Sequence, residues 1–143
     1  MRTSEADVLV VGAGPAGLTA SALLARAGVS AITVTKYAST ANSPRAHITN
    51  QRTVEVLRDL GIEEQVRAFA TPSSLMGNNV WAASFAGQEI ARLMTWGSGP
   101  ARKADYDNAS PSAMMNAPQH LLEPVTLMPR SATARTSGSP PSS

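Results

Sequence analysis

A G-x-G-x-x-G pattern at residues 12–17 is the feature that most restricts the fold of this chain. It follows the apolar run DVLVV of residues 7–11, which is typical of a strand buried on both faces of a parallel sheet. Residues 15–27 then carry helix-forming residues with apolar side chains at helical spacing, and Gly28 follows as a stop signal. The pattern predicts a strand, a tight glycine turn and a helix in succession.

A second apolar run at residues 31–35 predicts another strand directly after this helix. A strand, a helix and a strand within about thirty residues are typical of a βαβ unit. Because its crossover is right-handed, the two strands are expected to be parallel neighbours. The fold class is therefore α/β, and we expect the N-terminal part of a Rossmann-like domain.

Each glycine of the turn has a separate physical role. Gly12 permits the tight turn, Gly14 lets the backbone approach a pyrophosphate, and Gly17 lets the helix pack closely on the sheet. Free N–H groups and the dipole at the helix N-terminus then attract an anion without a basic side chain. A purely structural turn is the alternative, but the strand–turn–helix context favours dinucleotide binding.

The end of the second strand departs from the dinucleotide-binding pattern. This place usually carries an acidic residue that holds the adenosine ribose, and here it is Thr35, followed by Lys36. A threonine hydroxyl can form a hydrogen bond but cannot chelate two hydroxyls as a carboxylate does. Lys36 is either an adenosine contact or a solvated charge at the end of the strand.

A second helix is predicted after the polar loop of residues 38–46. Thr49 or Asn50 can cap it, and it runs to Leu60, where Gly61 ends it. Its predicted inner face consists of Val54, Leu57 and Leu60, and its predicted surface ion pair is Arg52 with Glu55.

Weaker patterns follow along the chain. Residues 80–94 suggest a β-hairpin with its turn near residues 86–87. The adjacent methionines 114 and 115 are interpreted as core residues. A last helix is expected to start near Pro118, and Pro124 leaves its continuation open.

Charge and composition exclude several classes of function. The net charge of +2 comes entirely from the last eighteen residues, because residues 1–125 carry ten basic and ten acidic side chains. The two arginines in that end are too few for nucleic-acid binding through phosphates. The chain has no cysteine, and its two histidines, His47 and His120, are far apart, so we expect neither disulfides nor a metal site.

The uncharged run of residues 8–25 is long enough to suggest a membrane span or a signal peptide. Its three glycines and Pro15 would interrupt such a helix, and Glu5 with Asp7 replaces the basic residues that precede a signal peptide's apolar core. The absence of cysteine also suits a reducing compartment. We therefore expect a cytoplasmic protein with no membrane segment.

The composition changes sharply near the end of the chain. From Pro129 onward Ser and Pro dominate, and no apolar side chain larger than alanine occurs. Such a segment cannot bury a core. We expect residues 1–125 to form a partial domain and residues 126–143 to be a disordered tail.

Several stretches, in this order and at these separations, resemble the N-terminal part of FAD-dependent aromatic-ring monooxygenases, most closely their phenol hydroxylase branch. The resemblance covers residues 7 to about 125 and is far more specific than the glycines alone. Its stretches are VLVVGAGPAGLTASALLARAG (8–28), SPRAHITNQRTVEVLRDLG (43–61), LMGNN (75–79), RKADYDNASP (102–111) and NAPQHLLEPV (116–125).

The resemblance implies an enzyme in which NADPH reduces bound FAD, and oxygen then forms a flavin hydroperoxide that hydroxylates a phenol or chlorophenol ortho to its hydroxyl. It also implies that the predicted hairpin is of the kind found in the substrate domain of these enzymes. It implies a pyrophosphate loop of Gly12, Ala13, Gly14, Pro15, Ala16 and Gly17, adenosine contacts at Thr35 and Lys36, an FAD contact at Arg45, and a contact near the ribityl chain at Gln119.

His47 is the one titratable residue that we consider for catalysis. Some members of the resembled family place an aspartate there, close to flavin and substrate, where it can assist phenol deprotonation. An imidazole ordinarily titrates near about pH 6.5, so His47 could accept a proton at neutral pH. The alternative is a structural hydrogen bond to the backbone.

Members of the resembled family are several times longer than 143 residues, and the likeness ends after Val125. We therefore expect the N-terminal portion of such an enzyme, inactive by itself, with exposed sheet surface through which it can self-associate. A frameshift or premature stop would explain an out-of-frame tail, and translating the other two frames beyond codon 125 tests this. The alternative function is a non-catalytic dinucleotide-binding module.

Overall fold

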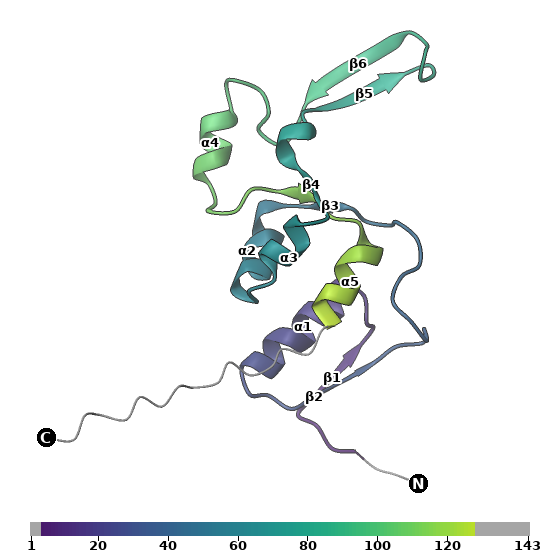
Figure 1. Cartoon of the computed structure of the whole chain (residues 1–143), viewed down its shortest axis with the longest axis vertical. Helices are drawn as coiled ribbons and strands as arrows, with labels where there is room; N and C mark the ends of the chain where they lie inside the picture. The colour runs from purple at the N-terminus through teal and green to yellow at the C-terminus, as the bar shows by residue number, and fades with distance from the viewer. Residues whose placement is uncertain (1–3, 128–143) are drawn as a thin grey trace, which may run out of the picture.

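The computed structural model of the chain describes residues 4–127 (Figure 1). It begins with strand β1 (Val8–Val11), helix α1 (Pro15–Arg26) and strand β2 (Ala31–Val34). The two strands pair in parallel, with Val8 opposite Ala31 and Val11 opposite Val34. This arrangement confirms the predicted βαβ unit and the α/β fold class.

A small antiparallel sheet of order β3-β7-β4 joins segments that are far apart in the sequence. Met115 of β7 lies opposite Thr49 of β3 and opposite Pro72 of β4. Strands of two residues have no hydropathy period, so none of these three strands was predicted from the sequence, and neither were α3 and α4. The elements after β2 are β3 (Ile48–Thr49), α2 (Gln51–Asp59), α3 (Glu63–Arg67), β4 (Thr71–Pro72), the 3-10 helix η1 (Ser73–Leu75), β5 (Asn78–Ala82), β6 (Glu89–Met94), α4 (Lys103–Asn108), β7 (Met115–Asn116) and α5 (Gln119–Leu127).

The hydrophobic core lies where α2 and α3 pack with β7 and α5. Both methionines at 114 and 115 are buried, which confirms their interpretation as core residues. Asn50 is the cap of α2, since its side-chain oxygen accepts a hydrogen bond from the Thr53 N–H at 2.8 Å. The core consists of Val54, Leu57, Leu60, Ile62, Val66, Met115, Ala117 and Leu122, which includes the predicted inner face of α2.

The outer face of α2 carries the predicted ion pair. The Arg52 guanidinium donates to a Glu55 carboxylate oxygen at 2.7 Å, and Arg52 is largely exposed. This hydrogen bond raises the pKa of Arg52 and lowers the pKa of Glu55. The two residues are about one helical turn apart and form a contact on the helix surface, as their spacing indicated.

Helix α5 continues through Pro124 to Leu127. The predicted start of the tail at residue 126 is therefore wrong for Thr126 and Leu127, which are helical. Pro124 lacks an N–H and removes one backbone hydrogen bond, while the Thr126 hydroxyl donates to the Leu122 carbonyl at 3.0 Å in the same turn. The rest of the predicted tail lies outside the described residues. Among the helices of residues 4–127, none combines the length and hydropathy that a membrane span requires.

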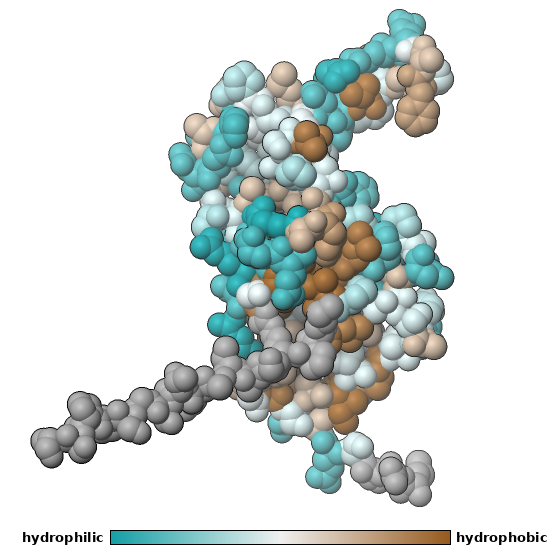
Figure 2. Space-filling model, viewed as in Figure 1, coloured by the Kyte–Doolittle hydropathy of each residue, from teal (hydrophilic) through white to brown (hydrophobic). Residues whose placement is uncertain are grey.

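Many of the exposed apolar side chains lie on the parallel sheet and on the hairpin. Helix α1 covers one face of the parallel sheet, and Leu9 and Val11 of β1 point away from it, 62% and 80% exposed. The hairpin of β5 and β6 confirms the prediction for residues 80–94 and extends away from the rest of the chain (Figure 1). Apolar surface is visible on the hairpin and over the region of α5 and the parallel sheet (Figure 2).

Candidate functional site: the glycine turn and helix α5

The glycine turn connects β1 to α1 in a conformation that its glycines make possible. Gly12 has a φ of 110°, which L side chains rarely adopt, and its N–H donates to the Val34 carbonyl at 2.8 Å. A Cβ on Gly17 would lie 1.9 Å from the Gly12 carbonyl oxygen. The first turn of α1 therefore packs directly on the glycine turn, as predicted for the third glycine of the pattern.

The surface in front of this turn is open. Among residues 4–127, and leaving out the chain neighbours of each glycine, no atom lies within 4 Å of where a Cβ on Gly12 would stand. At Gly14 a Glu123 carboxylate oxygen does, at 4.0 Å. Helix α1 has no side-chain cap and no acidic residue in its first turn. Its N-terminal N–H groups are thus left for another acceptor, and the helix dipole favours a negatively charged one. The cradle fits a pyrophosphate.

Helix α5 and the loop after β2 meet beside the turn through Glu123, which is only 2% exposed. One oxygen of its carboxylate accepts from the Gln119 side-chain nitrogen at 2.6 Å, and the other accepts from the Ala41 N–H at 2.6 Å. Since Glu123 also stands next to the Gly14 position, the fold brings Gln119 and the loop of residues 38–46 to the glycine turn.

The end of β2 lies beside the same turn because Gly12 is hydrogen-bonded to Val34. Thr35, the next residue, is exposed, and its hydroxyl oxygen accepts from the Tyr37 N–H at 3.3 Å. The Lys36 ammonium lies 5.1 Å from the centre of the Tyr37 ring. These side chains form the open border of the site on the side predicted for adenosine.

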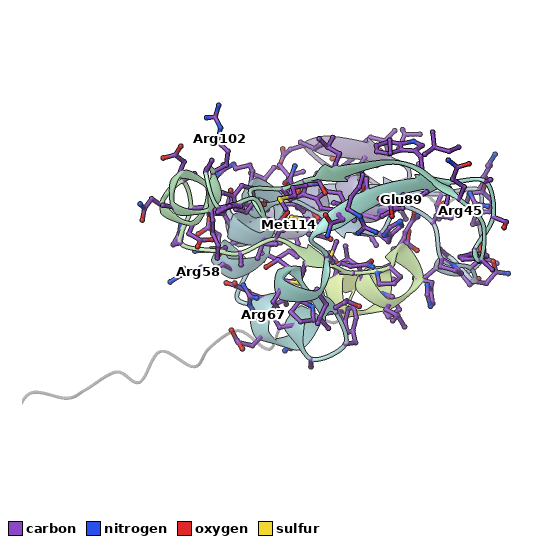
Figure 3. The ribbon with its side chains drawn as sticks, turned by 90° about the horizontal axis from the view of Figure 1, so that it is seen from above. Arg45, Arg58, Arg67, Glu89, Arg102 and Met114 are labelled. Carbon is purple, nitrogen blue, oxygen red and sulfur yellow. The ribbon has the colours of Figure 1, made fainter. Side chains whose placement is uncertain are left out.

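Arg45 and His47 are exposed on the segment between β2 and β3. The His47 Nδ1 lies 3.1 Å from the Asn116 side-chain oxygen, and the His47 carbonyl accepts from the Ala117 N–H at 2.7 Å. Arg45 lies on the outer loop, away from Arg58 (Figure 3). Within residues 4–127, no hydrogen bond or ion pair joins Arg45 or His47 to the glycine turn.

Glu123 and Asn116 are the two site residues to which the sequence analysis gave no role. Glu123 could have been found, because it is the one charged residue in the described part of α5 and lies four positions after Gln119 on the same face. Asn116 gave no such indication, because its position beside His47 depends on pairing between β3 and β7, which are far apart in sequence. Among the described residues, no three potential ligand side chains gather around a metal position.

The βαβ unit, the positive φ of the first glycine and the open, uncapped helix N-terminus define a dinucleotide-binding protein of the Rossmann-like class. The family model described as "FAD binding domain" matches residues 5–137. The chain therefore belongs to the FAD-binding domain family. The match extends past the predicted boundary at residue 125, and the out-of-frame origin of the tail stays a prediction.

Individual relatives agree with this assignment. The chain is 57% identical to 2,4-dichlorophenol 6-monooxygenase of Cupriavidus pinatubonensis over 123 residues, which cover 86% of the chain and 21% of that protein. It is 56% identical to phenol 2-monooxygenase of Pseudomonas sp. (strain EST1001) over 131 residues, which cover 92% of the chain and 21% of that protein. The chain thus spans about a fifth of the length of these relatives.

A solved structure is also similar. It is that of the flavin-dependent monooxygenase PieE in complex with FAD and substrate, which matches with a TM-score of 0.82 and 51% identity. The match covers 88% of the chain and 22% of PieE. The expected likeness to the N-terminal part of FAD-dependent phenol monooxygenases is confirmed, and so is the fold class.

Proposed function

We propose that this chain is the N-terminal portion of an FAD- and NADPH-dependent monooxygenase that hydroxylates phenols or chlorophenols ortho to the hydroxyl. The observation that carries the proposal is the open cradle at Gly14, in front of an uncapped helix N-terminus. It is supported by the names of the relatives, two of which are phenol or chlorophenol monooxygenases. FAD and NADPH are the cofactor and the co-substrate, and oxygen and a phenol are the reactants.

In this proposal, different residues of the chain contact different parts of FAD. The N–H groups at the start of α1 bind the pyrophosphate, Thr35 and Lys36 border the adenosine side, and Gln119 contributes from α5. Arg45, exposed on the loop, supplies a positive charge to the phosphates or the ring system. When bound, FAD supplies the redox chemistry that activates oxygen, and the protein positions it.

His47 is the residue that we assign to proton transfer in the longer enzyme. When its Nδ1 donates to the Asn116 side-chain oxygen, the ring orientation is fixed and Nε2 carries the free lone pair. The atom that accepts a proton from the phenol hydroxyl is then Nε2. The hydrogen bond to Asn116 gives the exposed ring a defined direction.

The isolated chain binds FAD without turning it over. Its parallel sheet has two strands and its hairpin is uncovered, so it offers one part of an FAD site and exposed apolar surface that favours self-association. We place the longer enzyme in the cytoplasm, because a chain without cysteine suits a reducing compartment.

Titration of FAD with the purified 143-residue chain, followed by the quenching of flavin fluorescence, tests the proposal. We expect saturable binding that excess ADP displaces, because ADP shares the pyrophosphate. NADPH oxidation assayed with and without phenol should stay at the background rate. No binding of FAD would contradict the cofactor assignment, and phenol-dependent NADPH oxidation would contradict the expected inactivity of the isolated chain.

A non-catalytic dinucleotide-binding module is the second candidate, and the departure from the pattern at Thr35 favours it. Without a carboxylate at the end of β2, the adenosine ribose, which FAD and NAD share, is held less firmly, as expected for a module that binds a dinucleotide weakly. Equal affinity for NAD and FAD would support this candidate. Yellow colour that stays with the chain during purification would support the flavin assignment.

A further inference from the structure

Glu123 is a buried carboxylate with no cationic partner among the described residues. It is 2% exposed, and its two oxygens accept from one side-chain amide and one backbone N–H. A buried charge is costly unless it is hydrogen-bonded, and here both donors belong to the site, one from α5 and one from the loop after β2. The positive end of the α1 dipole lies at Gly14, next to the same carboxylate.

The contact with Gln119 fixes the direction of a side-chain amide. An ionised carboxylate only accepts hydrogen bonds, so the amide nitrogen of Gln119 must face Glu123 and the amide oxygen must point away from it. Within residues 4–127, no hydrogen bond occupies the Gln119 side-chain oxygen. The Gln119 oxygen is therefore held as a free acceptor on a side chain that contacts Glu123, the residue next to Gly14.

We infer that Glu123 is a positioning residue, which turns the Gln119 carbonyl oxygen toward a ligand hydroxyl next to the pyrophosphate cradle and anchors the loop of residues 38–46 through Ala41. The inference rests on the proposed binding of FAD. It adds a specificity element, since a polyol hydroxyl can donate to this oxygen and a carboxylate or carbonyl cannot. FAD carries such hydroxyls on its ribityl chain, and ADP lacks that chain.

The substitution Glu123→Gln tests the inference with little change of shape. Gln at 123 can still accept from the Ala41 N–H with its one oxygen, and it then presents its amide nitrogen to Gln119, so the Gln119 amide must turn its oxygen toward residue 123. We expect FAD affinity to fall about tenfold and ADP affinity to change less than about twofold. Glu64→Gln is the matched control, since it removes one carboxylate that is 90% exposed on α3, and it should leave both affinities unchanged.

A double-mutant cycle isolates the coupling. In the Gln119→Ala background, Glu123→Gln should cost no further FAD affinity, because the oriented oxygen is already gone. The inference would be overturned by an equal loss of affinity for FAD and for ADP, by an unchanged affinity for FAD, or by additive losses of FAD affinity in the cycle.

A second readout does not depend on FAD. In NMR spectra of the full chain, the side-chain amide protons of Gln119 should exchange slowly with solvent and should lose this protection in Glu123→Gln. If Glu123→Gln fails to fold, rapid exchange in the unmodified chain still overturns the inference. If the unmodified chain shows the protection and yet does not bind FAD, the orienting role of Glu123 is supported and the proposed function fails.

Discussion

Substitution of Gly14 by alanine should weaken cofactor binding while leaving the fold intact. The φ of Gly14 is −81°, which any L-residue adopts, and the nearest atom to the new methyl group would be 4.0 Å away. Alanine replaces glycine at a helix N-cap at a cost of about 0.5–1 kcal/mol, and it restricts the unfolded chain, which offsets about 0.4–1 kcal/mol. The free energy of unfolding should therefore change by less than about 1 kcal/mol.

The same methyl group stands in the space that a pyrophosphate needs. It would keep the phosphate oxygens from the N–H groups at the start of α1, and a hydrogen bond to a charged group contributes about 1.5–3 kcal/mol. We expect FAD affinity to fall roughly 10- to 100-fold, which corresponds to about 1.4–2.8 kcal/mol. Flavin fluorescence quenching measures the affinity, and urea denaturation followed by circular dichroism measures the stability.

Gly17→Ala is the contrasting variant. Its Cβ would lie 1.9 Å from the Gly12 carbonyl oxygen, so the backbone must shift, and overpacking of this kind costs about 1–3 kcal/mol. This variant should lose both stability and FAD binding. FAD binding by Gly14→Ala as tight as that of the unmodified chain would contradict the role of Gly14 in the cradle. A Gly17→Ala variant as stable as Gly14→Ala would contradict the close packing at Gly17.

Three further predictions concern the fold. Leu57→Ala opens a cavity in the core between α2, α3 and α5 and should lower the free energy of unfolding by about 2–5 kcal/mol in urea denaturation; a loss below about 1 kcal/mol would contradict the assigned core. Asn50→Ala removes the cap of α2 and should cost about 0.5–2 kcal/mol in the same assay, whereas an unchanged midpoint would exclude the cap. Burial, with a smaller effect of Asp107, raises the pKa of Tyr106, so tyrosinate absorbance in a Tyr37→Phe variant should appear only above the ordinary tyrosine range. Because the unfolded chain then loses this proton first, stability should fall as the pH rises from the ordinary tyrosine pKa to the raised one; a rise in stability over that interval would contradict the sign.

Local patterns in the sequence were sufficient for the elements that depend on near neighbours. The βαβ unit was predictable because a β-branched run, a glycine turn and a helix period follow one another within one stretch of chain. Asn50 was one of two candidate caps, and the hydrogen bond from Thr53 decides between them.

Long-range contacts were not predictable in this way. The sheet β3-β7-β4 depends on two-residue strands. Its pairings bring Asn116 next to His47, although the two residues are 69 positions apart in the sequence. The role of Glu123 depends on the approach of Ala41 from a polar loop whose path carries no period. Pro124 left the continuation of the last helix open, and the structure decides it, because helix α5 tolerates this proline near its C-terminal end.

Phosphorus NMR of FAD during addition of the 143-residue chain tests most directly whether the glycine turn binds the cofactor's pyrophosphate. We predict that both pyrophosphate resonances shift and broaden as the chain is added, that Gly14→Ala needs at least about tenfold more chain for the same effect, and that Glu64→Gln behaves like the unmodified chain. Resonances that stay unchanged at an excess of folded chain, or that respond equally to Gly14→Ala, would contradict the assignment of the cradle to FAD.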